Sequence, residues 1–106
     1  MGKSTKMDES FTRVPNELFE ALLRQSLRIT QLKAALYIIR KTYGFNKQDD
    51  DISISQMAED TGLTRRAMVN AVHDLAKMGI VKLGTVHRGR RTSMKINDIE
   101  YWDKEI

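Results

Sequence analysis

The chain has 106 residues, of which 41% are hydrophobic and 30% are charged, proportions that are typical of one globular domain. Lys and Arg outnumber Asp and Glu by 18 to 14, and the net charge of +4 has the sign that a polyanionic partner requires. The absence of cysteine excludes a disulfide framework, a thiolate nucleophile and a cysteine-ligated zinc site. No apolar run approaches the roughly 20 residues of a membrane helix, so we expect a cytoplasmic protein without a membrane partner.

The first half of the chain has the patterns of two helices that follow a flexible tail. Residues 1–10 are polar and predict that tail, and helical spacing of apolar residues predicts a first helix over Asn16–Gln25. Thr30 is suited to cap a second helix, and Gly44 to end it in the left-handed conformation. One apolar stripe marks the expected buried side of this second helix: Leu32, Ala35, Leu36, Ile39 and Tyr43.

A polar segment and a capping pattern precede the third helix. Residues Asn46–Asp51 predict a turn, and Ile52 then begins a short strand or leads into a helix. Ser53 and Gln56 match a capping box, in which each side chain bonds the backbone N–H of the other residue. Gly62 can adopt a positive φ, so we expect a short helix that ends there.

The next helix follows after a tight turn. Thr64 is its expected N-cap, and it continues to Met78. Ala58 is small enough to let the two helices approach, while Leu63 and Met68 can fill the angle between them. The spacing of these residues predicts a helix-turn-helix.

The last third of the chain predicts a β-hairpin. Ile80–Leu83 has the pattern of a strand, His87–Arg91 that of a turn, and Met94 and Ile96 that of a returning strand. The order of elements predicts a mainly α fold with a small β-hairpin, a winged helix-turn-helix over residues 11–97. Residues 98–106 form a C-terminal tail that either packs on the core or makes a dimer contact.

The helix after Thr64 has two distinct sides when its residues are placed at 100° per residue. Met68, Ala71, Val72 and Leu75 form a core side, and the opposite sector contains no acid. Such a surface is what any exposed helix shows, but Arg and Asn are also the side chains that bond base edges. We therefore predict these residues as base-reading: Arg65, Arg66, Val69, Asn70 and His73.

The positive charge is concentrated in the hairpin. The segment from Lys82 to Lys95 contains no acid, whereas a loop that is charged for solubility alone would mix both signs. Cationic and hydroxyl side chains bind phosphates, so we expect contacts with the DNA backbone. The predicted backbone residues are Thr64, Lys77, Arg88, Arg90, Arg91 and Thr92.

Three segments of the sequence resemble the N-terminal domain of phage replication protein O: Val14–Leu18, Ile38–Lys47 and Ile52–Ala58. The resemblance covers residues 11–82 and implies an origin-binding replication initiator whose partner is double-stranded DNA with repeated origin sites. It also implies a homodimer on DNA, in the cytoplasm of a phage-infected or prophage-carrying bacterial cell. The family contacts the replicative helicase or its loader through a C-terminal region, which we expect to lie outside these residues.

Other classes of function remain open on the residues alone. A winged-helix transcriptional regulator has the same fold and the same contacts, and a winged helix that binds proteins has the same fold. An enzyme is disfavoured, because Asp49–Asp51 with His73 and His87 lacks the spacing of metal ligands and of any nucleophile motif. We expect no catalytic residue, no cofactor and no metal.

Overall fold

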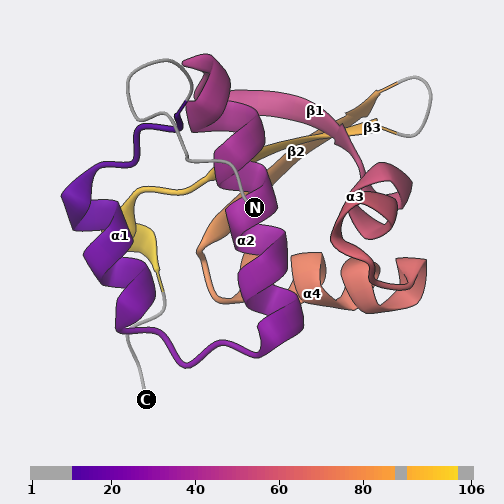
Figure 1. Cartoon of the computed structure of the whole chain (residues 1–106), viewed down its shortest axis with the longest axis horizontal. Coiled ribbons are helices and arrows are strands. Elements are labelled where there is room, and N and C mark those ends of the chain that lie inside the picture. Colours follow the sequence, from indigo (N-terminus) through magenta and orange to yellow (C-terminus); the bar gives the residue numbers. More distant parts are fainter. Residues whose placement is uncertain (1–10, 88–90, 103–106) are drawn as a thin grey trace, which may run out of the picture.

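A computed structural model describes residues 11–87 and 91–102 of the chain (Figure 1). Three sequence predictions lie outside this part: the flexible tail of residues 1–10, the role of Arg88 and Arg90, and the end of the tail, residues 103–106. The helices are α1 (Asn16–Leu23), α2 (Ile29–Thr42), α3 (Ile54–Thr61) and α4 (Arg65–Lys77), and the strands are β1 (Asp49–Ser53), β2 (Val81–His87) and β3 (Arg91–Ile96). Two 3-10 turns, η1 (Tyr43–Phe45) and η3 (Ile99–Tyr101), follow α2 and β3.

The described strands form one antiparallel sheet in the order β1-β3-β2. The predicted turn over Asn46–Asp51 is wrong in its second half, because residues Asp49–Asp51 pair with β3 from Lys95 to Ser93. The hairpin is confirmed, although its strands are longer than predicted, since His87 pairs with Arg91. The ladder of β2 and β3 shifts register between Leu83 and Val86, which places a bulge in the hairpin. The mainly α fold with a small β part is thus confirmed.

Both predicted ends of α2 are wrong. The N-cap is Arg28 rather than Thr30, and its backbone N–H donates to Gln31 Oε1 at 2.9 Å. After α2 the chain continues through η1, and the left-handed residue is Asn46, with a φ of 58°, rather than Gly44. Asn tolerates this conformation because its short side chain bonds locally. Gly44 instead leaves room for Arg40, whose Nη1 would lie 2.6 Å from an added Cβ.

The core lies between α2, α4 and the sheet (Figure 1). Ala34, Ala35 and Ile38 of α2 are fully buried, whereas Leu36, predicted for the buried stripe, is 46% exposed. From the segment after β3, Trp102 is also buried and its Nε1 donates to the backbone oxygen of Asn97 at 3.0 Å. This part of the tail therefore packs on the core.

The helix-turn-helix forms as the sequence predicts, with one exception. Ser53 Oγ accepts from the backbone N–H of Gln56 at 3.2 Å, but the Gln56 side chain donates forward to Asp60 Oδ1 at 2.9 Å. The predicted capping box is therefore only half formed. Gly62 has a φ of 78°, and Thr64 Oγ1 accepts from Ala67 N at 3.1 Å to cap α4. Each cap accepts a hydrogen bond from a backbone N–H group that would otherwise lack a partner at the start of the helix.

Candidate nucleic-acid interface

The exposed side of α4 is the side that the sequence predicts. Its buried side chains are Met68, Ala71, Val72 and Leu75, so the opposite sector faces solvent. Arg66, Asn70, His73 and Lys77 are all exposed there, and Val69 is partly exposed at the edge. These side chains combine positive charge, an amide and an imidazole, groups that hydrogen-bond base edges and phosphates.

The acidic residue of α4, Asp74, is turned away from this sector. Gln31 of α2 is 5% exposed, and its Nε2 donates to Asp74 Oδ2 at 3.1 Å. Because the Gln31 side-chain oxygen accepts from Arg28 N, one amide connects the start of α2 with α4. The contact holds the carboxylate between two helices and leaves the exposed sector free of acid.

The first turn of α4 is connected to α3 as well. Arg65 Nε donates to Ser55 Oγ at 3.1 Å, and both residues are exposed. The hydroxyl of Thr64, a predicted backbone contact, is also the N-cap acceptor. Ser55 was not predicted as a site residue, because helical periodicity carries no signal for a contact between two different helices.

The hairpin projects toward one end of the long axis, the end at which α3 and the turn to α4 also lie (Figure 1). Arg91 is exposed in β3 and its Nη1 donates to the backbone oxygen of Asp51 at 3.4 Å, while Thr92 is partly buried. Lys82 of β2 is exposed. Among the hairpin residues that are predicted to contact the DNA backbone, Arg91 and Thr92 lie in the described strand β3. Arg88 and Arg90 lie outside the described residues.

A polar network on α2 and α3 was not predicted. Tyr37 OH donates to Asp60 Oδ2 at 2.7 Å, and the Lys41 ammonium lies 5.5 Å from the centre of the Tyr37 ring. Burial, the hydrogen bond to Asp60 and the charge of Asp60 together raise the pKa of Tyr37 to about 12. The same hydrogen bond lowers the pKa of Asp60. The network connects α3 to α2, which in turn packs against α4.

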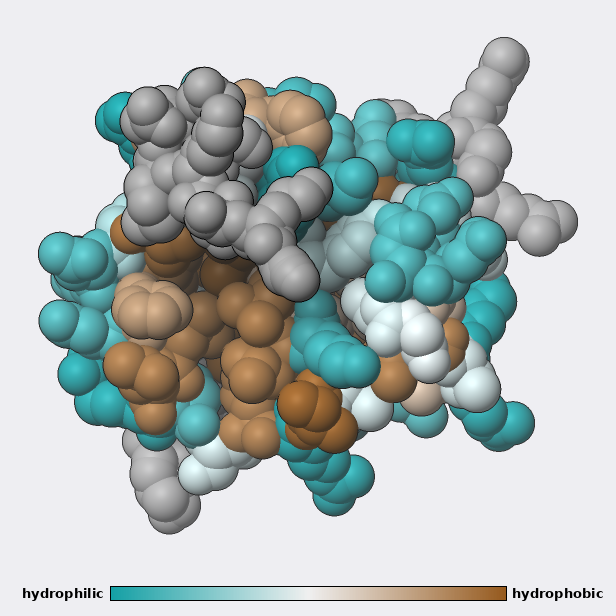
Figure 2. Space-filling model, in the orientation of Figure 1, coloured by the Kyte–Doolittle hydropathy of each residue, from teal (hydrophilic) through white to brown (hydrophobic). Residues whose placement is uncertain are grey.

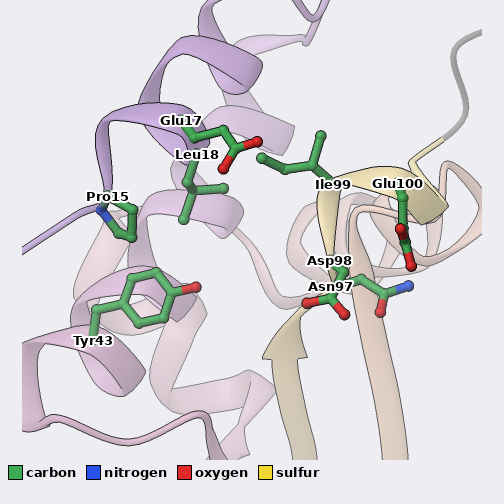
Figure 3. Close-up of a pocket in the computed structure, with 8 residues that line it drawn as sticks. All are labelled: Pro15, Glu17, Leu18, Tyr43, Asn97, Asp98, Ile99 and Glu100. Atoms are coloured by element: carbon green, nitrogen blue, oxygen red, sulfur yellow. The ribbon is translucent and has the colours of Figure 1, made fainter.

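A hollow of about 550 Å³ lies between the start of α1, Tyr43 and the segment after β3 (Figure 3). Figure 3 shows Glu17, Asp98 and Glu100 around it, together with apolar side chains. Burial and the charge of Asp98 raise the pKa of Tyr43. Three carboxylates repel phosphate, so this hollow is unsuited to nucleic acid.

Apolar side chains gather over α1 and α2 on the face shown in Figure 2. Phe19 and Leu23 of α1 and Ile29 of α2 are 53%, 72% and 64% exposed. An uncharged face of this kind offers no donors to phosphates. This apolar face and the acidic hollow are therefore less suited to bind phosphate than α4 and the hairpin.

Within residues 11–87 and 91–102, no helix combines the length and the apolar composition that crossing a membrane requires. The same residues contain no group of three or more His, Asp or Glu side chains arranged to hold a metal ion.

Comparison with known proteins gives three relatives. The chain is 34% identical to DNA replication protein gp18 of Salmonella phage P22 over 95% of its own length and 35% of the relative's. It is 40% identical to Replication protein O of Escherichia phage lambda over 72% of the chain, and 29% identical to Replication protein 15 of Enterobacteria phage phi80 over 76%. These alignments cover 23% and 26% of the two relatives, so the chain spans about a third or less of each protein.

The family model described as bacteriophage replication protein O matches residues 3–102. The match extends past Lys82, where the resemblance in the sequence analysis ended, and includes the hairpin and Trp102. Since it covers nearly the whole sequence, the chain belongs to the bacteriophage replication protein O family.

Proposed function

We propose that this chain is a winged-helix domain that recognises double-stranded DNA by sequence through the exposed side of α4. The observation that carries the proposal is the acid-free sector of Arg66, Asn70, His73 and Lys77, opposite a fully buried side of the same helix. In a helix-turn-helix the second helix enters the major groove. Arg typically bonds guanine and Asn adenine there, and a good bidentate pair contributes about 1 to 3 kcal/mol of discrimination.

In this proposal the hairpin is the wing and binds the DNA backbone. Arg91 and Thr92 are the described residues of that contact, and Arg88 and Arg90 are predicted to extend it. Phosphate contacts fix the position of the protein on the duplex without reading its sequence. They therefore complement the base contacts of α4.

The biological role we propose is origin recognition in phage DNA replication. Support comes from the family and from the names of two relatives, a DNA replication protein and a replication protein O. The chain acts by binding and carries out no chemical step itself. We propose that contacts with a replicative helicase or its loader, which the family resemblance implies, are not made by these 106 residues.

Footprinting on the DNA of a phage that encodes the chain tests this role. We expect protection of repeated sites within the replication origin, and loss of that protection in an Arg66→Ala, Asn70→Ala double variant. Arg24→Ala is a matched control, because it removes one exposed positive charge from the end of α1. Protection confined to a promoter operator would favour a transcriptional regulator instead, and no protection at low salt would favour a protein-binding winged helix.

We also propose that the chain binds repeated sites as a homodimer. Two half-sites place two reading helices about one DNA turn apart, roughly 34 to 36 Å. Sedimentation of the protein with a duplex that contains one protected repeat measures the stoichiometry. Two copies per repeat are expected, whereas one copy at saturating protein would contradict the dimer.

A further inference from the structure

Arg65 and Arg66 are neighbours in the sequence but belong to different surfaces. At 3.6 residues per turn they project about 100° apart around α4. Arg66 shares the exposed sector with Asn70, whereas Arg65 turns toward α3 and its Nε donates to Ser55 Oγ at 3.1 Å. The two arginines therefore present their guanidinium groups to different parts of a bound duplex.

The hydrogen bond to Ser55 occupies one of the five N–H donors of the Arg65 guanidinium. Both terminal nitrogens remain available, and they form the planar fork that matches a phosphate in a bidentate arrangement. Neither α3 nor α4 has an acidic residue in its first turn, so neither helix supplies a carboxylate there that would compete for this group.

The position of Arg65 relative to the two helices identifies its ligand. In a helix-turn-helix the second helix lies in the groove, while the first helix crosses the sugar-phosphate backbone. A guanidinium bonded to the first turn of α3 is directed toward the element that meets the backbone. We propose that Arg65 binds a DNA phosphate rather than a base edge, and that Ser55 is a positioning residue that holds its guanidinium for this contact.

This inference rests on the proposed DNA binding and changes the role that the sequence alone assigns to Arg65. It also adds Ser55, an α3 residue, to the interface. Fixing the side chain before binding lowers the entropy that is lost when the contact forms, since each long side chain that is immobilised on binding weakens affinity.

The test compares two duplexes, one with a sequence enriched by the protein from random DNA and one with that sequence scrambled. Arg65→Ala is expected to weaken binding to both duplexes by the same factor and to flatten the slope of log K against log salt by about 1. Arg66→Ala is the matched control, because it removes the same charge one residue along and is expected to reduce the preference for the enriched sequence.

Ser55 is tested through its dependence on Arg65. Ser55→Ala is expected to weaken binding to both duplexes by about threefold with the salt slope unchanged, because the positive charge remains. Ser55→Thr keeps the hydroxyl and is expected to retain wild-type affinity. In a chain that already carries Arg65→Ala, the Ser55→Ala change is expected to have no further effect.

Three results would overturn the inference. Arg65→Ala and Arg66→Ala would reduce the preference for the enriched sequence alike, Ser55→Ala would weaken binding equally in a chain without Arg65, or Ser55→Thr would weaken binding as Ser55→Ala does. Failure of the proposed function has a different signature, since the wild-type chain would then enrich no sequence and bind neither duplex.

Discussion

In the proposed interface, we expect the side chains on the exposed side of α4 to differ in how much each contributes to the free energy of DNA binding. Arg66 and Asn70 lie within the first two turns of the helix, from which base contacts are mainly made. Lys77 lies in the last turn, where a positive charge also interacts favourably with the helix dipole. The residues near the start of α4 are therefore the ones to change first.

Arg66→Ala and Asn70→Ala are each expected to lower affinity for the recognised sequence by about 1 to 3 kcal/mol, because a base contact is lost. Affinity for a scrambled duplex changes less, since phosphate contacts dominate there. Equilibrium titrations of both duplexes measure the two losses. Arg24→Ala serves as the control of equal charge, and equal losses on both duplexes would remove the base-reading role.

Tyr37 provides a prediction on pH. Its pKa of about 12 exceeds the ordinary value of 10.0, so the folded state favours the neutral hydroxyl. The free energy of unfolding that depends on this group is fully present below pH 10 and is lost as the pH rises toward 12. Ultraviolet titration of tyrosinate is expected to show this late component, which is absent in Tyr37→Phe.

Asp60→Asn separates the causes of this shift. Burial acts on Tyr37 in either protein, but the variant lacks the charge of Asp60. The pKa of Tyr37 is therefore expected to fall part of the way toward its ordinary value. A titration curve identical to that of the wild type would contradict a contribution of the Asp60 charge to the raised pKa of Tyr37.

At the scale of residues, helical periodicity was sufficient to predict which side of α4 is buried. Met68, Val72 and Leu75 lie there because an amphipathic helix has a single apolar side. The contacts from Tyr37 to Asp60 and from Gln31 to Asp74 join residues 23 and 43 positions apart. Such pairs depend on how helices pack, which the local pattern of one sequence does not specify.

Two glycines at element ends have the same backbone conformation but different surroundings. Gly62 and Gly79 both have a φ of 78°, in the left-handed region. A Cβ on Gly62 would meet no atom within 4 Å, whereas a Cβ on Gly79 would collide with the backbone oxygen of Tyr101. The turn between α3 and α4 is thus open, while the end of α4 is packed against η3.

Gly62→Ala is expected to lower the free energy of unfolding by about 1 to 2 kcal/mol, the cost of the left-handed conformation alone. Gly79→Ala is expected to lower it further, because the collision with Tyr101 adds to the same backbone cost. Urea unfolding of both variants measures the difference. Equal losses would show that η3 does not pack against Gly79 in solution.

Arg91→Ala tests the hairpin as an element that binds phosphates. We expect affinity to fall by a similar factor on all duplexes and the salt slope to flatten by about 1. Fluorescence anisotropy titrations at several salt concentrations measure the slope. Leu83 packs against the core, so Leu83→Ala is unsuitable as a control. Lys47→Ala is the control, because it removes an exposed charge that already pairs with Asp50. A salt slope unchanged by Arg91→Ala would show that Arg91 of the hairpin does not bind a DNA phosphate.

At the scale of elements, strong local signals predicted the helix-turn-helix and the hairpin. Ser53, Gly62 and Thr64 specify their turns through side-chain caps and a positive φ, so their positions follow from chemistry within a few residues. The partner strand of Asp49–Asp51 was not predictable in this way. Three consecutive acids usually indicate a turn, and here pairing with β3 outweighs that preference.

At the scale of the molecule, the acidic hollow and the basic hairpin lie apart. The hairpin extends toward one end of the long axis, and α1 lies toward the other, beside the hollow that contains Glu17, Asp98 and Glu100 (Figures 1 and 3). A separation of charge orients a protein as it approaches a polyanion. The net charge of +4 is small, and its distribution therefore matters more than its total.

The central claim is that the exposed side of α4 reads DNA sequence, and selection of bound duplexes from a random pool tests it most directly. The wild-type chain is expected to enrich one sequence, and Asn70→Ala is expected to lose the preference at one base pair, typically an adenine, while it keeps the others. A wild-type pool without any enriched sequence, or an Asn70→Ala pool with an unchanged sequence, would contradict the claim.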